Sequence, residues 1–195
     1  MPALPSGATT FLFTDIEGST PLWEQHPEAM RDVLARHDLL LRRAIDAHGG
    51  AVFKTVGDAF YAAFDEAAAG IAAALAAQRA LREIALSLPD AGGAHARGAM
   101  PVRVRMALST GAAEARDGDY FGPPLNRVAR LLAAAHGGQI LVSAATAELL
   151  HGWPVAGTEL RDLGEHRLRG LDASERVFQL VVPDLPADFP PLNTL

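Results

Sequence analysis

Cysteine is absent from this 195-residue sequence, and its absence excludes both a disulfide framework and a thiolate zinc site. An excess of basic residues is also missing, and a formal net charge of −6 argues against a broad electrostatic grip on DNA or RNA. The longest uncharged apolar run, residues 67–77, is too short and too rich in alanine to span a bilayer. Residues 1–8 lack the basic and apolar regions of a signal peptide. We therefore expect a cytoplasmic protein that binds neither nucleic acid nor a membrane.

The residues that are present suit one globular domain. Apolar residues make up 49% of the chain and charged residues 21%, and the length is sufficient for a single sizeable core. Apolar residues at helical spacing predict a helix over residues 30–45, which Gly49 and Gly50 end. Short apolar runs predict strands at 9–14, 51–56 and 59–64. Residues 102–108 alternate, with apolar side chains on one face and Arg103 and Arg105 on the other.

The later elements complete a mixed fold. We expect a second helix capped by Asp65, a helix over about 123–136, and a short helix capped by Ser143. Further strands are predicted at 139–142, 160–168 and 177–182. The order predicts an α+β fold with a ferredoxin-like βαββαβ core and an appended C-terminal helix and strands. The domain should cover residues 1–183. The proline-rich residues 184–195 are predicted to be a disordered tail, or a linker to further domains of a longer protein.

Two aspartates lie at strand ends beside turns that contain glycine. Asp15 precedes the turn Ile16-Glu17-Gly18-Ser19-Thr20, whose backbone N–H groups could bind phosphate oxygens. Asp58 lies at the tip of the hairpin between the second and third strands, and the third strand of a ferredoxin-like sheet neighbours the first. Two adjacent carboxylates would favour a divalent cation such as Mg²⁺ or Mn²⁺. Taken singly, each aspartate would equally suit a helix cap or a turn.

A second set of polar residues lies farther along the chain. Asn126 and Arg130 are four residues apart and share one face of the predicted helix, and Asp119 precedes that helix. Lys54 lies on the strand before the hairpin. These residues would also suit a solvated surface, and Arg105 would suit the exposed face of an edge strand. Neither an HExxH motif nor a Gx4GK[ST] loop is present. The residues alone therefore indicate a metal-dependent, phosphate-handling α+β domain.

Four segments resemble the class III adenylate/guanylate cyclase catalytic domain, in its order and at its spacing. They are FLFTDIEGST (11–20), VFKTVGDAFYAAF (52–64), VRVRMALSTG (102–111) and DYFGPPLNRVARL (119–131). The similarity extends over about residues 9–182. Ser19 stands where many animal enzymes carry phenylalanine, which is typical of a bacterial member.

The resemblance implies a role for each matching residue. Asp15, Asp58 and the carbonyl of Ile16 would bind two Mg²⁺ or Mn²⁺ ions per active site. The remaining residues would contact the nucleotide: Lys54 and Asp119 the base, Asn126 the ribose, Arg130 the transition state, and Arg105 the triphosphate, together with Gly18 and Ser19 in the turn. A second phosphate-binding residue falls near Arg167 or Arg169, and we choose Arg169.

The implied base-binding pair favours ATP. Adenine presents an acceptor at N1 and a donor at N6, whereas lysine can only donate and a carboxylate can only accept. Guanine reverses both groups. The resemblance also implies a homodimer whose sites combine metal residues of one chain with base and transition-state residues of the other. We therefore expect an adenylate cyclase that converts ATP to cyclic AMP and pyrophosphate. The alternatives are a cyclase for GTP or another nucleotide, and a catalytically silent module that binds nucleotide or dimerises.

Overall fold

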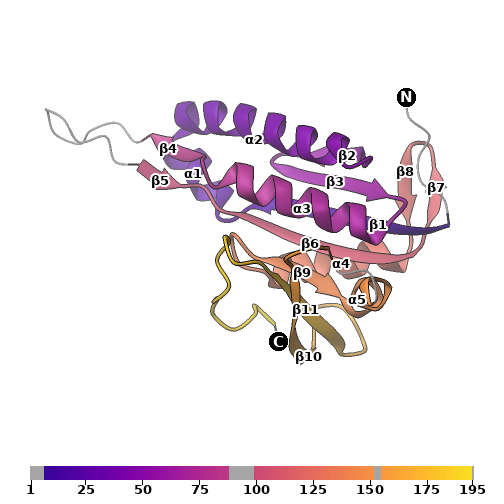
Figure 1. Cartoon of the computed structure of the whole chain (residues 1–195). Helices are drawn as coiled ribbons and strands as arrows, with labels where there is room; N and C mark the ends of the chain where they lie inside the picture. The colour runs from indigo at the N-terminus through magenta and orange to yellow at the C-terminus, as the bar shows by residue number, and fades with distance from the viewer. Residues whose placement is uncertain (1–6, 88–98, 152–154, 195) are drawn as a thin grey trace, which may run out of the picture.

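The computed structural model describes residues 7–87, 99–151 and 155–194; residues 1–6, which bear on the expectation about a signal peptide, lie outside them. A seven-stranded sheet forms the centre of the molecule, in the order β10-β11-β9-β6-β1-β3-β2 (Figure 1). Its strands are β1 (Ala8–Ile16), β2 (Ala51–Val56), β3 (Ala59–Phe64), β6 (Val104–Ala112), β9 (Ile140–Ser143), β10 (Glu159–His166) and β11 (Glu175–Val181). Two short ribbons pair β4 (Ala85–Ser87) with β5 (Ala99–Pro101), and β7 (Glu114–Arg116) with β8 (Asp119–Phe121).

The helices lie on both faces of this sheet. They are α1 (Ser19–Gln25), α2 (Pro27–Ala47), α3 (Ala67–Leu81), α4 (Pro123–Ala134) and α5 (Ala144–Leu150). Helices α2 and α3 cover one face and share a core with Leu12 and Ile16 of β1. Helix α4 covers the opposite face and packs on Phe11 and Phe13. Because side chains alternate along a strand, Asp15 projects from the same face as Phe11 and Phe13.

The ferredoxin-like core is confirmed by the strand pairing. Strand β1 pairs antiparallel with both β3 and β6, so the first four long strands lie in the order β6-β1-β3-β2. Strand β6 also pairs in parallel with β9, which extends the sheet through β11 to β10. The interpretation of Arg105 as part of an edge strand is therefore wrong, because β6 has a neighbour on each side.

Most of the helix signals agree with the structure. The predicted stripe of α2 is buried at Met30, Val33, Leu41 and Ile45. Ser143 caps α5 and accepts a hydrogen bond from the Thr146 amide at 3.3 Å.

The predicted cap of α3 is wrong. The N-cap is Glu66 rather than Asp65, and its side chain makes no capping hydrogen bond. Helix α4 ends at Ala134, two residues before the predicted end. Within the described segments, no helix is both long and apolar enough to cross a bilayer.

The tail differs from the expectation of a disordered end. Residues 184–194 form neither helix nor strand, yet they lie against the body of the domain. Arg79 donates to both carboxylate oxygens of Asp184, and the Asn193 amide donates to the Ala134 carbonyl at 3.0 Å. The domain boundary at residue 183 remains a prediction.

Candidate active site

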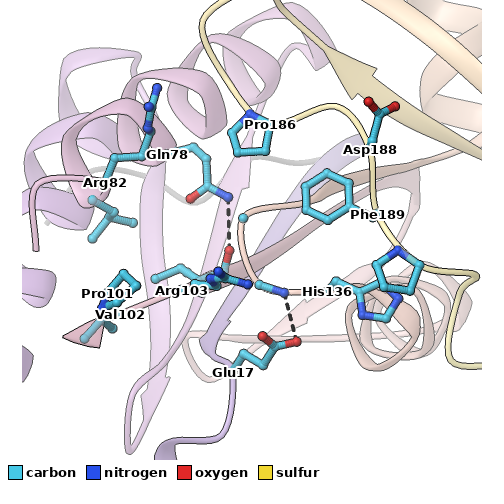
Figure 2. Close-up of a pocket in the computed structure, with 15 residues that line it drawn as sticks. Glu17, Gln78, Arg82, Pro101, Val102, Arg103, His136, Pro186, Asp188 and Phe189 are labelled. Carbon is cyan, nitrogen blue, oxygen red and sulfur yellow. Dashed lines mark hydrogen bonds between the residues drawn. The ribbon is translucent and has the colours of Figure 1, made fainter. Parts of the chain in front are cut away.

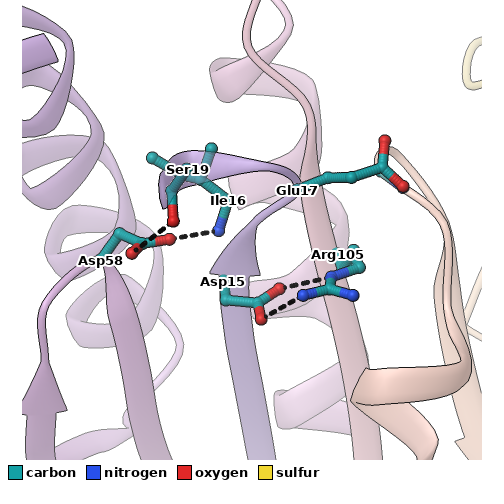
Figure 3. Close-up of polar contacts among 7 residues, drawn as sticks. Asp15, Ile16, Glu17, Ser19, Asp58 and Arg105 are labelled. Atoms are coloured by element: carbon teal, nitrogen blue, oxygen red, sulfur yellow. Dashed lines mark hydrogen bonds and ion pairs between the residues drawn. The ribbon is translucent and has the colours of Figure 1, made fainter. Parts of the chain in front are cut away.

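The two aspartates expected to bind metal lie beside one another. The β2–β3 hairpin places the Asp58 carboxylate against the end of β1, where it accepts hydrogen bonds from the Ile16 amide at 2.7 Å and the Ser19 hydroxyl at 3.1 Å (Figure 3). Asp15 immediately precedes Ile16. Gly57 supports this approach because its φ of 59° lies in the left-handed region, which glycine adopts without strain. The predicted proximity of Asp15 and Asp58 is thus present in the structure.

Asp15 is held by a bidentate ion pair. The Arg105 guanidinium donates from Nε at 2.7 Å and from Nη2 at 2.6 Å to the two carboxylate oxygens (Figure 3). This ion pair results from the register of β1 on β6, because Asp15 and Arg105 lie directly opposite each other in these two paired strands. Burial raises the pKa of Asp15 above its ordinary value, and the Arg105 guanidinium opposes that rise only in part. The arginine expected to bind a triphosphate therefore compensates the carboxylate that is expected to bind metal.

The candidate ligands suit a hard divalent cation that takes part of its coordination shell from water and phosphate oxygens. In the described segments, no three His, Cys, Asp or Glu side chains come together as a metal cage. Asp15, Asp58 and the Ile16 carbonyl would supply only oxygen ligands, and too few to fill a coordination shell. Mg²⁺ usually binds through one or two carboxylates together with waters and substrate phosphates. The residues present therefore fit Mg²⁺ or Mn²⁺ bound together with a phosphate-bearing ligand.

Lys54 and Asp119 form the second centre of the site. Lys54 Nζ lies 2.6 Å from Asp119 Oδ2, and Asp119 Oδ1 accepts from the Tyr120 amide at 2.8 Å. The hydrogen bond to Asp119 raises the pKa of Lys54, and the same bond lowers the pKa of Asp119. Both groups therefore stay charged near neutral pH, so Lys54 acts only as a hydrogen-bond donor and Asp119 only as an acceptor.

An open hollow of about 340 Å³ adjoins this pair, and Asn126 of α4 also lines it. The wall is mainly aromatic and apolar: Phe13, Phe53, Val56, Tyr61, Tyr120, Phe121 and Leu125. Several of the rings meet edge to face, among them Phe13 with Tyr61 at 4.3 Å and Phe53 with Tyr120 at 5.0 Å between centroids. A planar base could bind between these walls.

The sequence reasoning missed the aromatic wall, although a signal for it was present. Phe11 and Phe13 alternate along β1, and Tyr61 of β3 lies directly opposite Phe13, so strand periodicity places these three rings on one face. That face is the one covered by α4. The places of Phe13 and Tyr61 at the hollow could therefore have been deduced from sheet order, whereas Phe53 lies at a register shift between Val52 and Lys54.

Helix α4 presents Asn126 and Arg130 on its exposed side, while Val128 and Leu131 are buried. The Arg130 guanidinium lies against Gly170, where an added Cβ would approach Nη2 to 3.2 Å. The backbone next to Arg169 therefore lies beside Arg130. Arg167 and Arg169 are both exposed, and Leu168 between them is buried.

One chain thus carries two separate sets of the predicted residues. The first set is the turn at the end of β1 with its partners: Asp15, Ile16, Gly18, Ser19, Asp58 and Arg105. The second set is the hollow with Lys54, Asp119 and Asn126. The hollow is not lined by Asp15, Asp58 or Arg105. Tyr61 lies near both, because Lys54, Asp15 and Asp58 all influence its pKa, which burial raises.

Comparison with known proteins places the chain among cyclases. Residues 1–181 match the family model of the adenylate and guanylate cyclase catalytic domain. The protein Rv0891c of Mycobacterium tuberculosis is 43% identical over 192 residues, which are 97% of this chain but 61% of that relative. An adenylate cyclase of Schizosaccharomyces pombe is 32% identical over 92% of this chain, which spans 13% of that enzyme.

A solved structure supports the same assignment. Adenylate cyclase from Trypanosoma brucei, determined in its monomeric state, superposes with a TM-score of 0.82 at 28% identity, covering 98% of this chain and 94% of that one. Sequence and fold agree, and the chain belongs to the adenylate and guanylate cyclase catalytic domain family.

Proposed function

We propose that this chain is an adenylate cyclase that converts ATP to 3′,5′-cyclic AMP and pyrophosphate. The observation that carries the proposal is the Lys54–Asp119 pair at the aromatic hollow, with Asn126 on the same wall. The relatives from Schizosaccharomyces pombe and Trypanosoma brucei that are named adenylate cyclases favour the same substrate.

The preference for ATP rests on donor and acceptor polarity. Lys54 would donate to adenine N1, and Asp119 would accept from the N6 amine. Guanine offers N1–H to the ammonium and O6 to the carboxylate, so it would meet two mismatches. Tyr61 and the neighbouring rings would pack against the face of the base.

The active site is proposed to form across a homodimer. Within one chain, the metal-binding set lies outside the hollow, so a partner related by a two-fold axis would bring its own hollow to the first chain's aspartates. Val56 and Phe121 at the rim of the hollow are 56% and 43% exposed, as expected of residues that a partner covers. Each dimer would contain two equivalent sites.

The residues have distinct tasks in the proposed reaction. Bound Mg²⁺ or Mn²⁺ would lower the pKa of the ribose 3′-hydroxyl and neutralise charge on the phosphates. Asp15, Asp58 and the Ile16 carbonyl would hold the two ions. Asn126 would orient the ribose, and the Arg130 guanidinium would stabilise charge that develops on the α-phosphoryl oxygens.

The leaving pyrophosphate would be bound by other groups. Arg105 would exchange part of its contact with Asp15 for the phosphates once cations compensate that carboxylate. Arg169 and the backbone of Gly18 and Ser19 would complete the triphosphate site. No protein nucleophile takes part.

The proposal is tested by incubating the purified chain with Mn²⁺ and each of the four nucleoside triphosphates, followed by chromatography for cyclic products. Cyclic AMP should be the main product, and an Asp58→Asn variant should produce none. A chain that forms only cyclic GMP would refute the assigned base specificity. A chain that binds ATP and Mn²⁺ but forms no cyclic nucleotide would instead be a silent module.

A further inference from the structure

A second cavity in the described segments lies apart from the hollow that is proposed to bind the base. Its volume is about 620 Å³, and its lining includes Glu17, Arg103, His136 and Gly137 of the body (Figure 2). Phe189 and neighbouring residues of the C-terminal tail form another wall. Glu17 directly follows Ile16, so this cavity reaches the turn that would hold the metal ions.

The tail that closes this cavity is bound mainly through its backbone. Arg161 Nη1 and Gln179 Nε2 both donate to the Ala187 carbonyl, at 2.9 Å and 2.7 Å. The His136 imidazole donates from Nε2 to the Pro191 carbonyl at 2.9 Å. Side chains of the body thus satisfy carbonyls of a proline-rich segment that is neither helix nor strand. Such contacts require a fixed position of the tail rather than a particular tail sequence.

A relay of buried amides connects the tail to the loop between α4 and β9. The His136 amide donates to Gln139 Oε1 at 3.0 Å, Gln139 Nε2 donates to Gln179 Oε1 at 2.8 Å, and Gln179 Nε2 donates to Ala187. Gln139 and Gln179 are each 2% exposed. A buried amide without a partner is costly, so the relay is satisfied only while the Ala187 carbonyl stays in place.

The same loop reaches the metal-binding turn through Glu17. The Gly137 amide donates to Glu17 Oε1 at 3.0 Å (Figure 2). The Glu17 amide in turn donates to the Arg103 carbonyl at 2.9 Å. A side chain at Gly137 has no room, because its Cβ would lie 2.4 Å from Arg103 Cβ. The His136 ring lies parallel to the Phe189 ring, at 4° and 6.5 Å between centroids. The tail, the loop and the turn are therefore in continuous contact.

We propose that Glu17 is a positioning residue for the metal-binding turn, and that the C-terminal tail sets its position through His136 and Gly137. This inference rests on the proposed function. Glu17 would not touch the ions; it would anchor the turn on the side opposite to the bonds that Asp58 makes with Ile16 and Ser19. A displacement of the tail would release the Gly137 amide, and the Ile16 carbonyl would lose its fixed direction.

Three variants of the full chain test this role. Glu17→Ala removes the acceptor, Glu17→Gln keeps an oxygen that can accept from Gly137, and Phe189→Ala loosens the tail at a half-buried ring. A control, Glu148→Ala, removes an exposed carboxylate on α5. We expect kcat to fall about tenfold in Glu17→Ala with little change in KM for ATP, since one hydrogen bond to a charged acceptor is lost. Glu17→Gln should restore most of that loss, which it would not do if the charge itself bound an ion.

Amide hydrogen exchange gives a second readout that does not depend on turnover. Peptides covering residues 14–20 and 134–140 should exchange faster in both Glu17→Ala and Phe189→Ala, and should be unchanged in Glu148→Ala. The combined Glu17→Ala and Phe189→Ala variant should be little worse than Glu17→Ala alone, because both act through one contact.

Two results would overturn the inference. One is faster exchange confined to the tail in Phe189→Ala, with residues 14–20 unaffected. The other is a Glu17→Gln variant as impaired as Glu17→Ala. If the wild-type chain formed no cyclic product, the proposed function would fail, whereas the exchange comparison would still decide whether the tail positions the turn.

Discussion

Exchanging the two members of the base-reading pair should move nucleotide preference from ATP toward GTP. In the double variant Lys54→Glu and Asp119→Lys, the ion pair is retained with its polarity reversed. The carboxylate would then accept from guanine N1–H, and the ammonium would donate to O6. The wild-type pair is only 2.6 Å apart, so the reversed pair can form across the same two strands with little change in the hollow.

The size of the effect follows from the exposure of the pair. A site that hydrogen-bonds a substrate group can reject an analogue lacking the matching group by about 10⁴- to 10⁵-fold. Lys54 and Asp119 are 48% and 27% exposed, so water can partly satisfy a mismatched group. We therefore expect the wild type to favour ATP by about 10²-fold in kcat/KM, and the exchanged variant to favour GTP.

The assay is kcat/KM for both triphosphates with saturating Mn²⁺, in the wild type and in the double variant. The single variant Lys54→Glu is the control, because it places two carboxylates together and should impair both substrates. An exchanged variant that folds, forms cyclic AMP and keeps the wild-type ratio of ATP to GTP turnover would refute the assignment of this pair to the base.

Three further predictions concern the metal site, the transition state and the core. Because burial raises the pKa of Asp15, protonation of Asp15 should compete with Mn²⁺ binding at a higher pH than for an ordinary aspartate. In Mn²⁺ titrations the affinity should fall as the pH drops through the raised pKa, and in Arg105→Ala this fall should occur at a still higher pH. An Mn²⁺ affinity that does not vary with pH would contradict this prediction. The same raised pKa means that folding favours the neutral carboxyl, so this group's contribution to stability is present at low pH and is lost as the pH rises. Arg130→Lys should lower kcat about 10²-fold while KM changes little, because an ammonium cannot reproduce the guanidinium fork; a raised KM with kcat unchanged would argue for a ground-state role. Gly50→Ala should lower the free energy of unfolding by about 1–3 kcal/mol in urea titrations, because the added Cβ would lie 2.3 Å from the Phe64 ring. An unchanged urea midpoint would contradict this, because it would mean that the core adjusts to the added methyl group without loss of stability.

Much of the fold could be predicted because its signals are local. Alternation over residues 102–108, the helical stripe of α2 and the Ser143 cap each depend on neighbours within a few positions. The proximity of Asp15 and Asp58 also followed, since the strand order of a ferredoxin-like core determines it.

The remaining features depend on contacts between distant residues. The Asp15–Arg105 pair joins residues 90 positions apart and requires the register of β1 on β6. The tail has the composition of a disordered segment, but its carbonyls bind side chains that only the folded body brings together, such as Arg161 and Gln179. The change of cap from Asp65 to Glu66 is a shift of one residue, which propensity alone does not resolve.

The most direct measurement of the central claim is complementation between two inactive chains. Asp15→Ala removes a residue of the metal-binding set, and Asn126→Ala removes a residue of the hollow. If each site takes one set from each chain, a mixed dimer contains one site with both lesions and one intact site. An equal mixture should therefore recover about a quarter of the wild-type activity, with half of the dimers mixed and half of their sites intact. A mixture that stays as inactive as its two components, although mixed dimers are detected, would contradict an active site built from two chains.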